Sequence, residues 1–150
     1  MNSTASKLSI QFISIMEQKL ATIGMHRVSK RESVFMSDEK GESRGWLGLN
    51  IYTHKQIITI AINPEIGIRH TEVEAIYAEI MPHIDNSIAP TVFFNIGYLT
   101  IFKNYKTWGI NNERDIEPRA ENIFSKIKSL GIPFIEKKFG FKLTLQDYSA

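Results

Sequence analysis

The sequence contains no cysteine, and this absence excludes several classes of protein. A disulfide scaffold, a thiolate zinc site and a cysteine nucleophile all require cysteine. The chain also lacks an apolar run of the roughly 20 residues that would cross a bilayer. Its apolar residues near the N-terminus are interrupted by polar ones, unlike the core of a signal peptide. We therefore expect a cytoplasmic protein that does not contact a membrane.

Sequence motifs for common chemistries are missing as well. The chain has neither a glycine-rich phosphate loop nor the G-x-S-x-G turn that carries a serine nucleophile. Its four histidines lie too far apart in the sequence to form a helical pair of metal ligands. We expect no catalytic residue, no metal and no cofactor. A catalytic triad assembled from distant residues remains an alternative, since triads are recognised by geometry rather than by sequence.

The length and the charge indicate an ordinary globular protein. The 150 residues are the size of one domain, and no Pro/Gly/Ser-rich linker divides them, so we predict a single domain over 1–150. The net charge of +2 is a weak argument for nucleic-acid binding. The basic excess lies between Lys103 and Lys142, and such charge runs usually form solvated helix faces.

Hydrophobic periodicity predicts the first half of the fold. Apolar residues from Leu8 to Ile23 recur every three to four positions, which indicates a helix. Residues 27–36 alternate weakly and predict an edge strand, and residues 37–45 predict a loop. Residues 46–52 and 56–63 alternate clearly, and the short polar link between them indicates an antiparallel hairpin. Pro64 should end this hairpin, because proline cannot donate a backbone hydrogen bond.

Three more helices and two aromatic-rich strands are expected in the second half. The segment from Thr71 to Glu74 matches a capping box, which places a helix over 72–81. Its apolar stripe follows helical spacing and consists of Val73, Ile76, Tyr77 and Ile80. Strands are predicted over 91–96 and 98–108. The next helix should begin at Asp115 or Glu117 and end at Gly131 and Pro133, with a short helix over 134–139.

The order of these elements determines the expected fold class. Strands follow one another directly instead of alternating with helices, which favours antiparallel pairing. We predict an α+β domain with an antiparallel sheet of four to five strands and helices packed mainly on one face.

Two groups of residues are candidates for a functional surface. Arg69 and His70 lie just before a predicted helix, where backbone N–H groups could help to hold an anion. The alternative is a plain connection in which Arg69 pairs with an acid such as Glu65 or Glu72. The second group combines strand aromatics with a basic residue and consists of Trp46, Tyr52, Tyr98, Lys103, Tyr105 and Trp108.

The aromatic group has three interpretations. An exposed patch of Trp and Tyr would favour a protein partner, because these residues dominate binding hot spots. With nearby lysines such as Lys55 and Lys106, the same patch could stack single-stranded bases. The aromatics could instead fill the second side of the core.

The layout of the chain resembles the small cytoplasmic immunity proteins of bacterial toxin systems, including contact-dependent growth inhibition. The resemblance lies in the size, the lack of cysteine, the leading amphipathic helix, the segment Trp46-Leu47-Gly48-Leu49-Asn50 and the helix ending in Ser129–Phe134. It implies stoichiometric binding to one toxin domain without chemistry. The alternatives are a nucleic-acid-binding module and a small enzyme that acts on an anionic substrate through Arg69 and His70.

Overall fold

Six strands form one antiparallel sheet in the computed structural model, which describes residues 3–53 and 59–140. The strands are β1 (His26–Arg27), β2 (Val34–Met36), β3 (Ser43–Thr53), β4 (Ile60–His70), β5 (Val92–Asn95) and β6 (Trp108–Ile110). They pair in the order β1-β2-β3-β4-β5, and β6 pairs with β4. The predicted α+β class is confirmed, with one strand more than the upper limit that we expected.

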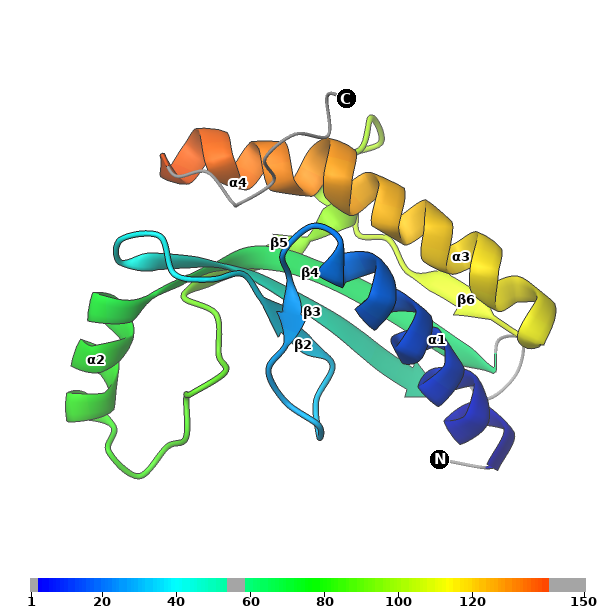
Figure 1. Cartoon of the computed structure of the whole chain (residues 1–150), viewed down its shortest axis with the longest axis horizontal. Coiled ribbons are helices and arrows are strands. Elements are labelled where there is room, and N and C mark those ends of the chain that lie inside the picture. The colour runs from blue at the N-terminus through cyan, green and yellow to red at the C-terminus, as the bar shows by residue number, and fades with distance from the viewer. Residues whose placement is uncertain (1–2, 54–58, 141–150) are drawn as a thin grey trace.

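The helical layer lies on one side of this sheet, while one helix stands apart (Figure 1). The helical elements are α1 (Ser3–Ala21), α2 (Thr71–Ile80), the 3-10 turn η1 (Ile96–Leu99), α3 (Glu113–Lys126), the π-helical turn η2 (Ile127–Gly131) and α4 (Ile132–Phe139). Helix α2 projects from the end of β4, away from α1 and α3. Within the described ranges, no helix is long and apolar enough to cross a membrane.

The alternation predicted for the central hairpin is confirmed. The side chains of Leu47 and Leu49 on β3 join those of Ile62 and Ile66 on β4 in the main core beneath the helices. The opposite face carries Trp46, whose indole lies over Gly48, where a Cβ would overlap the ring. The two faces of the sheet therefore differ: helices cover one, and the other is partly open.

Pro64 does not end the hairpin, so that prediction was wrong. Strand β4 continues through it to His70 and pairs with β3 along its whole length. The carbonyl of Ile68 accepts from Thr91 N–H, so even-numbered residues of β4 direct their backbone groups away from β3. Pro64 lies between the part of β4 that pairs with β6 and the part that pairs with β5. Its missing N–H therefore costs no ladder bond.

The predicted strand over 98–108 was also wrong, and the reason is a single side chain. The amide oxygen of Asn95 accepts from the N–H groups of Gly97 and Lys106, and its amide nitrogen donates to the Lys106 carbonyl. These bonds close residues 96–106 into a loop. Of residues 96–110, only Trp108–Ile110 joins the sheet.

Three smaller boundaries differ from the predictions. The weak strand over 27–36 divides into β1 and β2, and β3 begins two residues before the end of the predicted loop. Helix α3, predicted to begin at Asp115 or Glu117, begins after Asn112, which forms a capping box with Asp115. Positions 56–58 of the hairpin and the end of the chain beyond Gly140 lie outside the described residues.

Gly131 and Pro133 do not interrupt the C-terminal helices. Gly131 keeps right-handed helical angles, and a Cβ there would overlap the side chain of Ile66 on the sheet. Pro133 lies near the start of α4, directly after the π-helical turn η2, and the helical backbone continues through it. Two residues that commonly end a helix here allow it to continue close to the sheet.

Candidate functional site

Helix α2 exposes the apolar side that an amphipathic helix normally buries. Its four apolar stripe residues are 40–70% exposed, and the only buried residue of the helix is Glu74. We call these four residues the α2 stripe: Val73, Ile76, Tyr77 and Ile80. Their spacing of i, i+3, i+4 and i+7 places them on one side of the helix. A helix of this pattern usually packs its apolar side on a core. The exposed stripe is therefore a candidate binding surface.

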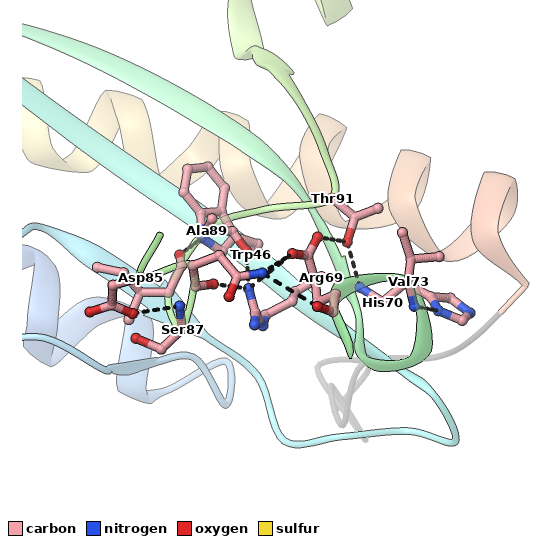
Figure 2. A network of polar contacts seen from close by, with 11 residues as sticks. Trp46, Arg69, His70, Val73, Asp85, Ser87, Ala89 and Thr91 are labelled. Atoms are coloured by element: carbon pink, nitrogen blue, oxygen red, sulfur yellow. Dashed lines mark hydrogen bonds and ion pairs between the residues drawn. The ribbon is translucent and has the colours of Figure 1, made fainter. Parts of the chain in front are cut away.

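A partly buried polar network around Glu74 fixes this orientation (Figure 2). One Glu74 carboxylate oxygen accepts from Asn86 Nδ2 at 2.8 Å, and the other accepts from Thr91 Oγ1 at 2.7 Å. The guanidinium of Arg69 lies 3.8 Å from the same carboxylate and donates to the carbonyls of Asn86 and Ala89. A half-turn of α2 would expose these bonds and leave Arg69 without its acid. The network therefore keeps Glu74 inward and the α2 stripe outward.

The segment 81–91 that follows α2 is attached to the open face of the sheet. The indole N–H of Trp46 donates to the Ile88 carbonyl at 2.8 Å, and Ile88 packs on Val34, Met36 and Trp46 in a second apolar cluster. A turn within the segment is stabilised by Asp85, whose pKa is lowered because its carboxylate accepts from the backbone and then the side chain of Ser87. Helix α2 thus has a fixed support at both ends.

Arg69 and His70, predicted to hold an anion, are engaged within the chain. Arg69 pairs with Glu74, not with Glu65 or Glu72 as the plain-connection alternative suggested. His70 caps α2, since its Nδ1 accepts from Val73 N–H, and its Nε2 lies 3.6 Å from Glu42. The predicted capping box was therefore wrong in detail: His70 caps the helix in place of Thr71, and Glu74 faces the sheet.

The predicted aromatic surface separates into an exposed and a buried part. Tyr52, Tyr98 and Tyr105 are each about half exposed. Burial raises the pKa of Tyr105, and the neighbouring Tyr52 and the carboxylate of Glu65 raise it further. Lys103 is exposed in the turn after η1 and has a left-handed backbone, with φ of 46°.

Both tryptophans lie outside this exposed part. Trp46 is 5% exposed beneath the 81–91 segment. Trp108 is 4% exposed on the helix-covered face, where its indole donates to Asn122 of α3 at 2.7 Å. These two residues follow the core-filling interpretation, and neither can touch a partner in this structure.

Three hollows along α1 contain none of the predicted site residues. A groove with a volume of about 520 Å³ lies between α1 and the end of β3, and its charged residues are Glu17, Arg27, Arg31 and Glu32. Glu17 and Arg27 pair with each other at 3.8 Å. Within residues 3–53 and 59–140, no group of three or more acidic or histidine side chains could hold a metal ion.

Sequence reasoning found the α2 stripe as a helix side but did not identify it as a surface. The one signal in the sequence was Glu74. This acid lies beside the apolar positions of the helix, and it would need a partner if it faced the sheet. Comparisons with known proteins add no further assignment. No protein-family model matches the chain, and neither a curated protein nor a solved structure matches it significantly.

Proposed function

We propose that the protein is a non-catalytic protein-binding module that acts as an immunity protein, binding and neutralising a cognate bacterial toxin domain. The observation that carries this proposal is the solvent-exposed α2 stripe. An amphipathic helix that places anchors at i, i+3, i+4 and i+7 into a groove is a recurring mode of protein recognition. The α2 stripe has this spacing.

The apolar area of the stripe is large enough to matter energetically. Full burial of one aliphatic side chain contributes roughly 1.5–3 kcal/mol, so covering a half-exposed one contributes about 1 kcal/mol. Ile76 and Ile80 are more than half exposed and are the largest contributors that we expect. A partner that covered the whole stripe would therefore gain several kcal/mol before the cost of association.

The support of α2 favours tight binding. The Glu74 network and the attached 81–91 segment hold the helix before any partner arrives. A helix that is already ordered loses less conformational entropy on binding than one that must fold on its partner. This rigidity suits a stoichiometric inhibitor, whose only task is to occupy a surface.

A test is to co-express the chain with the product of a neighbouring reading frame that arrests growth. We expect co-purification of the two proteins and rescue of growth. Ile76→Ser and Ile80→Ser should each weaken binding about ten-fold or more, because each leaves an apolar contact unmade. The matched control is Ile10→Ser. Ile10 is also 70% exposed, but it lies on α1, in the helical layer away from α2.

Two results would contradict this proposal. One is a neighbouring toxin domain that neither binds the chain nor is neutralised by it. The other is binding that survives both α2 substitutions and is lost in Ile10→Ser. Titration with single- and double-stranded oligonucleotides at two salt concentrations tests the nucleic-acid alternative, since phosphate contacts give a steep salt dependence.

A further inference from the structure

We infer that the α2 stripe binds a partner surface that is basic as well as apolar, so that lysine or arginine side chains flank the residues covering the stripe. This inference rests on the proposed protein-binding function and adds the chemistry of the partner. It is drawn from the charges that surround the stripe in the described chain.

Acidic side chains border the stripe along its length. Glu72 and Glu79 are exposed on α2 itself, and Asp85 is exposed just beyond the helix. At the other end, the loop before β3 lies against the start of α2, since Thr71 N–H donates to the Glu42 carbonyl at 2.8 Å. We call the exposed acids of these segments the acidic frame: Asp38, Glu39, Glu42, Glu72, Glu79 and Asp85.

Lysine and arginine side chains in and beside these segments are few, and most of them are engaged within the chain. Arg69 is bound to Glu74 and two carbonyls, and Arg44 donates to the Ser37 carbonyl. Lys40 is the one exposed lysine or arginine in the described segments 37–43 and 71–91. The frame therefore carries a net negative charge beside an apolar stripe, although the whole chain is slightly basic.

Charge complementarity favours one kind of partner for the α2 stripe. A partner with basic flanks is attracted to the frame and steered toward the stripe. A second copy that packed its α2 against this α2 would bring the two acidic frames together, which is unfavourable. Anionic lipid and nucleic acid would meet the same repulsion. A basic protein surface is the occupant that the observed charges favour.

Two synthetic helical peptides test this chemistry with the full chain. Both carry leucine at i, i+3, i+4 and i+7, and their flanking positions are lysine in one and glutamate in the other. Fluorescence anisotropy at low and high salt measures the two affinities. We expect the lysine peptide to bind about ten-fold more tightly at low salt, because a few rim charge pairs contribute roughly 0.2–1 kcal/mol each. The difference should shrink at high salt.

Single substitutions test whether the acidic frame causes the preference for the lysine peptide. Glu79→Lys should weaken the lysine peptide several-fold and strengthen the glutamate peptide. The matched control is Glu32→Lys, because Glu32 is an exposed acid in the turn between β1 and β2, outside the frame. Ile80→Ser should weaken both peptides.

The outcomes separate this inference from the function on which it rests. Equal affinity for both peptides, preference for the glutamate peptide, no binding of the lysine peptide or no effect of Glu79→Lys would overturn the basic partner. Adsorption to anionic vesicles, or self-association that Ile80→Ser abolishes, would overturn it in favour of another occupant. In all these cases, the proposed protein-binding function is retained if toxin neutralisation still depends on Ile80. It is contradicted if neutralisation is independent of Ile80.

Discussion

Replacing Glu74 with alanine should release α2 from its fixed orientation. The carboxylate accepts two hydrogen bonds and faces Arg69, and both side chains are largely buried, at 10% and 15% exposure. Removing one partner of a buried ion pair costs roughly 3–5 kcal/mol, because the other charge is left buried without it. Arg69 keeps its bonds to two carbonyls. We therefore expect a cost of about 3 kcal/mol, at the lower end of this range.

The cost should appear as local opening of residues 71–91. Helix α2 contributes no apolar side chain to the buried core, so detaching it exposes little core surface. A loss of about 3 kcal/mol in local stability corresponds to roughly a hundred-fold faster amide exchange in that segment. Hydrogen-exchange mass spectrometry would measure this rate, with peptides from α1 and α3 as an internal reference.

Two further variants make this prediction specific. Glu72→Ala removes an exposed acid from the same helix and should change stability by less than about 0.5 kcal/mol. Glu74→Gln keeps the shape and part of the hydrogen bonding and should give an intermediate effect. If Glu74→Ala left the exchange of 71–91 as slow as in the unsubstituted protein, the network would not be what orients α2.

Three other predictions concern the sheet and the side chains that lie on or beside it. Gly67→Ala should destabilise the protein by about 1–3 kcal/mol or more in urea denaturation, because its Cβ would overlap a backbone carbonyl of β5; an unchanged midpoint would contradict the close approach. Trp108→Phe should cost about 1 kcal/mol through the lost bond to Asn122, and a double-mutant cycle with Asn122→Ala should be non-additive. The raised pKa of Tyr105 means that the folded protein holds this proton to higher pH than the unfolded chain, so stability should fall as the pH rises above about 10. Glu65→Gln should lower this pKa without restoring its ordinary value, since burial remains; ultraviolet titration with Tyr105→Phe as the assignment control would check it.

Local patterns were sufficient for the elements with strong periodicity. The first helix and the alternation in the central hairpin both depend on neighbours within a few residues. Gly24, which follows the first helix, adopts the left-handed backbone that glycine commonly takes after a helix, with φ of 75°. Such features carry their physical cause in the local sequence.

Breaker residues were less informative because their effect depends on distant partners. Pro64 lies within a strand because two other strands leave a gap beside it. Gly131 remains in a helix because that helix passes close to Ile66 on the sheet. In the same way, Asn95 turns an aromatic-rich stretch into a loop through bonds to Lys106, eleven residues away.

The candidate site shows the same limit. The sequence alone predicted an amphipathic helix over 72–81, which the structure has over 71–80, and placed Val73, Ile76, Tyr77 and Ile80 on one side of it. Only the tertiary structure decided which side faces solvent. That choice depends on Arg69, Asn86 and Thr91, which lie outside the helix and reach Glu74 once the sheet and the 81–91 segment have folded together. Periodicity specifies the relative positions of side chains on a helix, whereas its rotation about its axis is set by long-range contacts.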